Sequence, residues 1–209
     1  MTKNLDIDGL RSIVENYDIF YIDLWGVIHN GITLHKKAIE TLAEISNAKK
    51  NYVLLTNAPR PNSTVKNYLK KMGMNEKIRE KVYSSGEASL DYLKKNYLSE
   101  TFYHIGPPRD FDLFLEFEKN KRKNINESSY LLCTGLFENH DEDLDYYKEL
   151  FKDHLDKKMI CTNPDLIVDR GKKRELCAGS VALVFEKMGG KVIYFGKPFS
   201  EVYNQSINN

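Results

Sequence analysis

The sequence has little of what marks an exported protein, a membrane protein or a metal cluster. Its 209 residues include three cysteines, which lie far apart at Cys133, Cys161 and Cys177. An odd number of cysteines without paired spacing argues against a disulfide framework and against a zinc site. Nowhere do about 18 apolar residues follow one another, and the polar, acidic start of the chain lacks the basic flank and apolar stretch of an export signal. We therefore expect a cytoplasmic protein without a membrane span.

An excess of charge of one sign is also missing. The chain has 31 lysine and arginine residues against 30 aspartate and glutamate residues, so its formal net charge is +1. This balance gives no reason to expect nucleic acid as a partner. Hydrophobic residues make up 41% of the chain and charged residues 29%, which is typical of a globular protein and excludes the disordered class. The glycine-rich loops of common nucleotide-binding folds are absent as well, which argues against a plain nucleotide-binding domain.

Short apolar runs alternate with stretches of helical periodicity, which predicts an α/β fold with a parallel sheet and crossover helices. A polar, lysine- and asparagine-rich stretch at 119–129 predicts a solvated loop. The predicted strands are Ile19–Ile22, Tyr52–Leu55, Lys81–Ser84, Phe102–Ile105, Tyr130–Cys133, Lys158–Cys161 and Val192–Phe195. The predicted helices are Lys36–Ala48, Ser63–Met72, Ala88–Tyr97, Asp141–His154 and Leu176–Met188.

The first predicted strand ends in Asp23, followed by Leu24, Trp25 and Gly26. Ligands of open parallel sheets bind at the carboxyl ends of the strands, so a carboxylate at this place is a candidate nucleophile that forms a covalent intermediate. An aspartate after a strand also caps ordinary turns. Asp23 alone leaves both interpretations open.

Two further strand ends carry side chains that suit a phosphate group. The second strand delivers Thr56 and Asn57 just before Ala58 and Pro59. A hydroxyl and an amide are neutral donors for phosphate oxygens, although threonine and asparagine also serve as ordinary caps. The last strand ends in Gly196 and Lys197, whose ammonium can neutralise a phosphate or the nucleophile carboxylate. A lone lysine after a strand is more often solvated.

Taken together, an aspartate, a hydroxyl residue and a lysine follow three strands in that chain order. This pattern resembles the haloacid dehalogenase superfamily, and the long insertion before the lysine is similar to its type IIA, or NagD-like, branch. Blocks that resemble one uncharacterised subgroup of that branch are found over nearly the whole chain. These blocks are Asp-Leu-Trp-Gly-Val-Ile-His-Asn-Gly at 23–31, Ser-Gly-Glu-Ala at 85–88, Thr-Asn-Pro-Asp at 162–165 and Cys-Ala-Gly-Ser at 177–180.

The resemblance implies a Rossmann-like core with an inserted α/β cap domain. Residues 1–100 and 175–209 would form the core, and residues 101–174 the cap. The resemblance further implies roles for single residues: Asp23 as nucleophile, Thr56 and Asn57 as the phosphate-binding loop, Lys197 as charge neutraliser, Asn163 and Asp165 as cap residues that face the substrate, and Asp23 with the Trp25 backbone carbonyl as ligands of Mg²⁺.

Two departures from the family pattern bear on activity. Most phosphatases of the superfamily carry a second aspartate two residues after the nucleophile, where this chain has Trp25. An indole cannot act as a general acid or base. Either another group supplies the proton, with His29 and water as weak candidates, or turnover is slow, or the leaving group needs no proton. The fourth motif of the family, which supplies further acids for the metal, is expected beyond residue 209. By this interpretation the chain ends before its last catalytic element and binds metal weakly.

The sequence therefore predicts a Mg²⁺-dependent hydrolase that acts on a small phosphate monoester through an aspartyl-phosphate on Asp23. A catalytically weak module that binds a phosphorylated ligand is the alternative, because Trp25 replaces the general acid and the fourth motif is absent. The expected partner is a small phosphorylated metabolite. The oligomeric state stays open, a homo-oligomer included.

Overall fold

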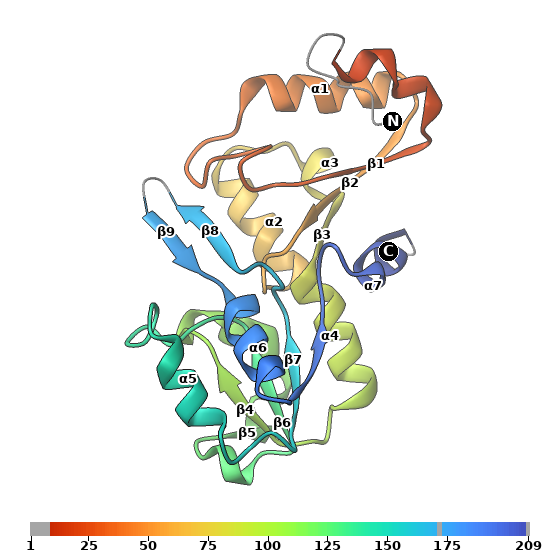
Figure 1. The fold of residues 1–209 in the computed structure, drawn as a ribbon. Coiled ribbons are helices and arrows are strands. Elements are labelled where there is room, and N and C mark those ends of the chain that lie inside the picture. Colours follow the sequence, from red (N-terminus) through yellow and green to blue (C-terminus); the bar gives the residue numbers. More distant parts are fainter. Residues whose placement is uncertain (1–8, 171–172, 208–209) are drawn as a thin grey trace.

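The computed structural model describes residues 9–170 and 173–207, except for the side chain of Arg170. The described part of the chain has an α/β fold with parallel sheets, as the sequence predicts. It forms a three-stranded sheet in the order β1-β2-β3, a five-stranded sheet in the order β10-β7-β6-β4-β5, and a hairpin of β8 and β9. Figure 1 shows the two sheets in separate halves of the molecule, with the hairpin beside the region where the halves meet.

The strands of the two parallel sheets match the predicted apolar runs closely. The smaller sheet consists of β1 (Ile19–Ile22), β2 (Asn51–Thr56) and β3 (Val82–Ser84). The larger one consists of β4 (Phe102–Ile105), β5 (Lys121–Arg122), β6 (Tyr130–Cys133), β7 (Lys158–Cys161) and β10 (Lys191–Tyr194). The antiparallel hairpin pairs β8 (Ile167–Arg170) with β9 (Lys173–Leu176).

Helices connect the strands and cover the sheets. They are α1 (Lys36–Asn47), α2 (Asn62–Lys71), α3 (Glu76–Arg79), α4 (Ser85–Asn96), α5 (Leu144–Phe151), α6 (Ala178–Lys187) and α7 (Ser200–Ile207). Short 3₁₀ segments are η1 (Leu10–Ser12), η2 (Val14–Asn16), η3 (Pro108–Asn120) and η4 (Ile125–Glu127). Polar side chains start several helices: Ser84 accepts a hydrogen bond from the Glu87 N–H, and Asp143 accepts two at the start of α5.

Alternation along the strands divides the buried side chains into three clusters, because successive residues point to opposite faces of a sheet. Leu54 and Val82 point towards α1 and α2 in one cluster, while their neighbours Leu55 and Tyr83 belong to a second cluster. This second cluster also contains Phe102 and Ile160 of the larger sheet together with α4, so it joins the two halves. The third cluster lies between the larger sheet and helices α5 and α6.

The strand pairing differs in one respect from the expected division of the chain. The sequence predicts residues 175–209 in the same unit as 1–100, but β10 pairs in parallel with β7, with Lys191 opposite Lys158. Helix α6 packs its buried side chains against the same larger sheet. The residues from 178 to 194 therefore extend the larger sheet, and the chain returns to the smaller sheet only after β10. A division into core and cap stays a prediction.

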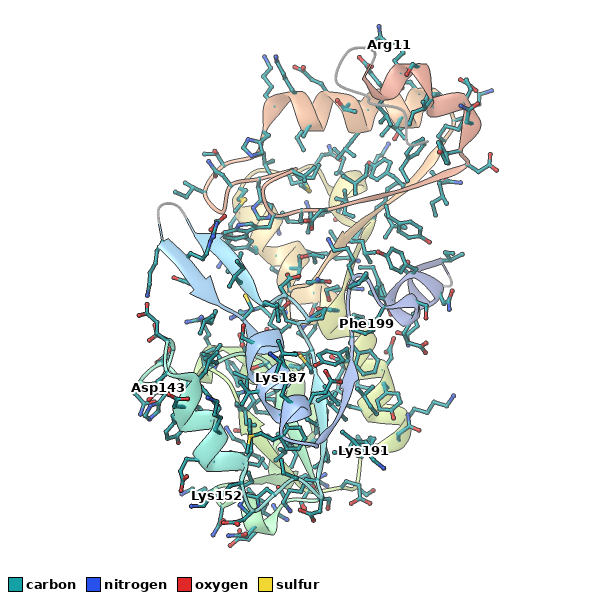
Figure 2. All side chains as sticks on the ribbon, viewed as in Figure 1. Arg11, Asp143, Lys152, Lys187, Lys191 and Phe199 are labelled. Carbon is teal, nitrogen blue, oxygen red and sulfur yellow. The ribbon has the colours of Figure 1, made fainter. Side chains whose placement is uncertain are left out.

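The stretch 119–129 is more ordered than the predicted loop. Here the end of η3 leads into β5, which pairs with β4, and η4 follows. Ile125 is buried, which fixes this polar segment to the domain despite its composition. Figure 2 shows charged side chains of both halves, with Arg11 and Lys152 labelled towards opposite ends of the view. In the described ranges, no helix combines the length and apolar character needed to cross a bilayer.

Candidate active site

The carboxyl ends of the two parallel sheets meet, and the predicted site residues lie along this seam. β1 ends just before Asp23, β2 ends at Thr56, β7 leads into the loop 162–165, and β10 is followed by the loop that contains Lys197. Several side-chain contacts cross from one half of the molecule to the other. Figure 1 shows the ends of β2, β7 and β10 converging between the two halves. The fold thus brings loops from distant parts of the sequence into one place.

Asp23 and Lys197 form the centre of the site. The Lys197 Nζ atom lies 2.6 Å from Asp23 Oδ1, and the same oxygen accepts a hydrogen bond of 2.8 Å from the Leu24 N–H. The Asp23 side chain keeps 43% of its exposure and that of Lys197 keeps 23%, so a ligand can reach both. The ammonium also donates to the Leu55 carbonyl at 2.9 Å. An aspartate and a lysine separated by 174 positions in the chain are therefore in direct contact.

Thr56 is placed beside this pair by the register of the smaller sheet. It is the last residue of β2, directly after Leu55, whose carbonyl holds the lysine. Its side chain is buried, and its hydroxyl accepts a weak hydrogen bond of 3.3 Å from the Ala58 N–H. The bond turns the chain sharply after the strand. This is the position that the sequence predicts for a phosphate-binding hydroxyl, and that role stays a prediction.

The Asn57 side chain holds the loops around Lys197. Its Oδ1 accepts a hydrogen bond of 2.7 Å from the Lys197 N–H, and its Nδ2 donates to the Lys197 carbonyl at 3.1 Å. The same Nδ2 donates to Asp165 Oδ1 at 2.8 Å. The amide thus links the ends of β2, β7 and β10. The predicted phosphate contact of Asn57 stays a prediction, because its side-chain donors and acceptor already have protein partners here.

Asn163 and Asp165 lie in a loop with fixed geometry. The Asn163 side chain accepts a hydrogen bond of 3.0 Å from the Asp165 N–H. Gly179, near the start of α6, packs so closely that a Cβ atom there would lie 2.2 Å from the Pro164 carbonyl oxygen. Partial burial raises the pKa of Asp165, and the charge of Asp23 adds to this rise, while the Asn57 bond and Lys197 oppose it. Asp165 is therefore a second carboxyl group at the seam, firmly positioned.

Trp25 connects the Asp23 loop to the β8–β9 hairpin. Its indole N–H donates a hydrogen bond of 3.0 Å to the Asp169 carbonyl on β8. The ring lies against Gly31, where an added Cβ would be 2.8 Å from the indole. Gly31 has a φ of 90°, which a residue with a side chain rarely adopts. The large side chain two residues after Asp23 thus connects the hairpin to this end of the site.

His29, a weak candidate for proton transfer in the sequence, is poorly placed for that task. Its side chain is buried, and its Nδ1 accepts a hydrogen bond of 3.0 Å from the Gly31 N–H. Burial lowers the pKa of His29, an effect that the nearby Asp23 partly opposes and the His35 charge reinforces. It packs edge-on against Trp25, with ring centroids 5.5 Å apart. These contacts favour a structural role in the loop.

A partly buried ion pair that sequence reasoning missed also crosses the seam. Arg60, just after the β2 loop, donates to the buried carboxylate of Asp110 at 2.9 Å. Burial raises the pKa of Asp110, with Arg60 as the main opposing influence. Beside it, His104 is hydrogen-bonded to Thr134 at 2.9 Å and its burial lowers its pKa to about 3. No local signal marks this cluster, since its members are distributed over four separate segments.

The residues at the seam offer few ligands for a metal ion. No group of three or more His, Cys, Asp or Glu side chains within the described ranges is arranged to hold one. The Asp23 carboxylate and the Trp25 carbonyl are the oxygens that the sequence predicts for this purpose. Mg²⁺ commonly keeps several waters and binds through one or two carboxylates together with substrate phosphate, so this small set fits a weakly held Mg²⁺.

Comparisons with known proteins show which hydrolases the chain is similar to. A family model described as haloacid dehalogenase-like hydrolase matches residues 20–118, which contain the Asp23 and Thr56 loops. A haloacid dehalogenase-like hydrolase from Brucella suis 1330 is 29% identical, with a TM-score of 0.84 over 95% of this chain and 73% of that one. No curated protein matches the chain.

Two further solved structures share the fold at lower identity. A p-nitrophenyl phosphatase from Archaeoglobus fulgidus is 17% identical with a TM-score of 0.69, covering 91% of this chain and 73% of that one. NagD from E. coli K-12 is 22% identical with a TM-score of 0.65, again over 91% of this chain and 73% of that one. These two likenesses show the fold alone, while the family model and the Brucella structure show that the chain is similar to haloacid dehalogenase-like hydrolases.

Proposed function

We propose that the chain hydrolyses a small phosphate monoester through a covalent aspartyl-phosphate on Asp23. The contact of 2.6 Å between Asp23 Oδ1 and Lys197 Nζ carries this proposal, because it brings together the carboxylate proposed as nucleophile and the ammonium proposed as charge neutraliser. Thr56, the last residue of β2, supports it as a donor for the phosphate oxygens. Positioning and charge stabilisation supply most of the rate in phosphoryl transfer.

In the first step an Asp23 oxygen attacks phosphorus while the bond to the leaving oxygen breaks. Lys197 stabilises the negative charge on the transferring group, and its bond to the Leu55 carbonyl fixes the ammonium. In the second step water attacks phosphorus and releases Asp23. The larger sheet and the β8–β9 hairpin would act as the cap that excludes bulk water and contacts the leaving group. Asn163 and Asp165 lie on the cap side of the seam.

Mg²⁺ is the cofactor that these residues would hold, through the Asp23 carboxylate and the Trp25 carbonyl. When bound, it would offset the repulsion between an anionic nucleophile and an anionic substrate. Among the side chains themselves, Lys197 already supplies one positive charge to Asp23. We therefore expect phosphate binding to persist without Mg²⁺, and turnover to depend on it.

Phosphate release from a panel of small phosphate esters, with Mg²⁺ present, tests the proposal. Asp23→Asn keeps the shape of the side chain and removes the nucleophile, so it should abolish release. Asp18→Asn is the matched control, since this exposed aspartate precedes β1 and its contact is a distant one of 3.9 Å with Lys50. Hydrolysis that survives in Asp23→Asn at the wild-type rate would show that Asp23 is not the nucleophile.

A catalytically weak module that binds a phosphorylated ligand is the second candidate. Trp25 favours it, because an indole that is hydrogen-bonded to the Asp169 carbonyl occupies the position where most relatives in the superfamily have an acid. Under this alternative the chain binds phosphate esters without releasing phosphate, and Trp25→Asp raises turnover. This alternative is excluded if the wild-type chain releases phosphate and Asp23→Asn abolishes that release.

A further inference from the structure

The two proton transfers of the proposed hydrolysis need a side chain that the sequence alone does not identify. The leaving oxygen takes up a proton in the first step, and the attacking water gives one up in the second. The Trp25 indole cannot do either, and its N–H is bonded to the Asp169 carbonyl. His29 is buried, and its Nδ1 already accepts the Gly31 N–H. A different titratable group at the seam has to be considered.

Asp165 is the candidate that the contacts at the seam favour. It follows β7 of the larger sheet, whereas Asp23 follows β1 of the smaller sheet. In phosphoryl transfer the attacking and leaving oxygens lie roughly in line, so a phosphate attacked by Asp23 would carry its leaving oxygen on the side away from Asp23, where the loops of the larger sheet are proposed to contact it. The Asn57 amide bonds Oδ1 of Asp165 at 2.8 Å, and this same amide holds the backbone of Lys197. One carboxyl oxygen is thereby oriented by the protein, which leaves Oδ2 as the oxygen that would exchange the proton.

The loop around Asp165 is rigid enough to keep this orientation. Its backbone N–H donates to the Asn163 side chain, and its carbonyl accepts the Gly179 N–H at 3.1 Å. The Gly179 position tolerates no side chain, since a Cβ atom would lie 2.5 Å from the Asp165 carbonyl oxygen. Side chains that transfer protons work best when their position is fixed before the reaction. The charged groups that influence the carboxyl are Asp23 and Lys197.

We propose that Asp165 is the general acid and base of this site, in place of the residue at position 25. The inference rests on the proposed phosphatase function. As an Asp23 oxygen bonds to phosphorus, the proton on Asp165 Oδ2 passes to the leaving oxygen while its bond to phosphorus breaks. The resulting Asp165 carboxylate then takes a proton from the water that attacks phosphorus, and the bond from Asp23 to phosphorus breaks. Asp165 ends protonated and Asp23 ends as a carboxylate.

The ionisation of Asp165 is suited to this cycle. Partial burial raises its pKa above the ordinary value of an aspartate, as does the negative charge of Asp23. Catalytic acids are most effective when their pKa lies close to the working pH. The bond from Asn57 and the charge of Lys197 act in the other direction.

Leaving-group dependence separates this catalytic role from a purely structural one. Asp165→Asn keeps an oxygen that can accept the Asn57 bond but has no proton to transfer, whereas Asp165→Ala loses both. A simple alkyl phosphate needs a proton on its leaving oxygen, while 4-nitrophenyl phosphate releases a stable phenolate. In Asp165→Asn we expect kcat/KM to fall by about 10² to 10⁴ for the alkyl ester and by less than about tenfold for the aryl ester.

The controls keep the outcomes distinct. Asp145→Asn, on the exposed side of α5, should match wild type on both substrates. Equal losses on both substrates in Asp165→Asn, or no loss on either, would overturn the assignment and leave Asp165 as a support for Asn57. Activity that survives in Asp23→Asn would instead refute the proposed function itself. Should Asp165→Asn fail to fold, kcat/KM of the wild-type chain is measured for esters of graded leaving-group pKa. A steep decline of kcat/KM towards poor leaving groups contradicts the proposal.

Discussion

Lys197 shows how the contacts of a single residue depend on the fold. After its strand in the sequence it could equally be a solvated lysine, and its contact with Asp23 and the Leu55 carbonyl supports the role proposed for it. The lysine backbone is held in turn by the Asn57 side chain. The residue is thus fixed at both ends, which is what charge stabilisation of a transition state requires.

Replacing Lys197 by methionine should reduce kcat/KM for phosphate release by about 10² to 10³, because one stabilising donor at the transferring group is lost. Lys191→Met is the matched control, since this exposed lysine begins β10, the strand that leads into the loop of Lys197. Steady-state assays on the two purified variants measure the effect. A Lys197 variant that stays within twofold of wild type would mean that the lysine contacts Asp23 without assisting the reaction.

Elements near the seam were only partly predictable from the sequence. The apolar runs locate β1, β4, β6 and β7 to the residue, because burial on both faces demands continuous apolar side chains. The hairpin of β8 and β9 was missed, since its strands carry charged residues and little apolar alternation. The parallel pairing of β10 with β7 was not foreseen either, because strand order depends on contacts between residues far apart in the chain.

The site, too, was only partly predictable from the sequence. Motifs at strand ends identified Asp23, Thr56 and Lys197, since each combines an apolar strand with a chemically suited side chain. The bond between Asn57 and Asp165, and the ion pair of Arg60 with Asp110, join segments about 50 to 108 positions apart. No periodicity or local spacing encodes such contacts, so they became visible only in three dimensions.

The hairpin should depend on Trp25 for its local stability. Trp25→Phe keeps an aromatic ring but removes the N–H that donates to the Asp169 carbonyl. A single hydrogen bond contributes about 0.5 to 1.5 kcal/mol, so hydrogen exchange of the paired amides in β8 and β9 should become about two- to tenfold faster. Exchange in β6, which is buried in the larger sheet, serves as the internal control. Unchanged exchange in the hairpin would show that Trp25 does not fasten it.

The start of α4 packs against the loop after β2 at Gly86. An added Cβ there would lie 2.2 Å from the Arg60 backbone nitrogen, so Gly86→Ala should lower the free energy of unfolding by about 1 to 3 kcal/mol. At Gly73 a Cβ atom would meet nothing within 4 Å, and Gly73→Ala should cost only about 1 to 2 kcal/mol for its positive φ. Urea unfolding measures both. A Gly86 variant as stable as wild type would contradict this close packing.

The free energy of unfolding of the molecule should fall in acid because of His104. Its folded pKa is about 3, against an ordinary value of 6.5, because burial and Lys121 disfavour the charged imidazole. A lowered folded pKa means that the unfolded chain takes up the proton first. The resulting stability is fully present above pH 6.5 and is lost as the pH falls towards 3. This change should appear as a decrease in the global free energy of unfolding.

Between pH 7 and pH 4.5, wild type should lose about 2 to 3 kcal/mol more stability than His104→Gln, because each pKa unit corresponds to about 1.4 kcal/mol. Glutamine does not titrate and can still bond the Thr134 hydroxyl, which limits other effects of the change. Urea unfolding of both proteins at several pH values gives the comparison. Parallel pH profiles for the two proteins would show that His104 titrates normally.

For the molecule as a whole, we propose that the seam between its two parallel sheets is a phosphoryl-transfer site centred on Asp23. Direct chemical trapping tests this proposal. The chain is mixed with a substrate phosphate ester and Mg²⁺, quenched in acid, digested, and its phosphorylated peptide is identified by mass spectrometry. We predict an acyl phosphate on Asp23 that is absent from Asp23→Asn. A phosphate attached to another residue while hydrolysis proceeds would contradict the assignment of the nucleophile.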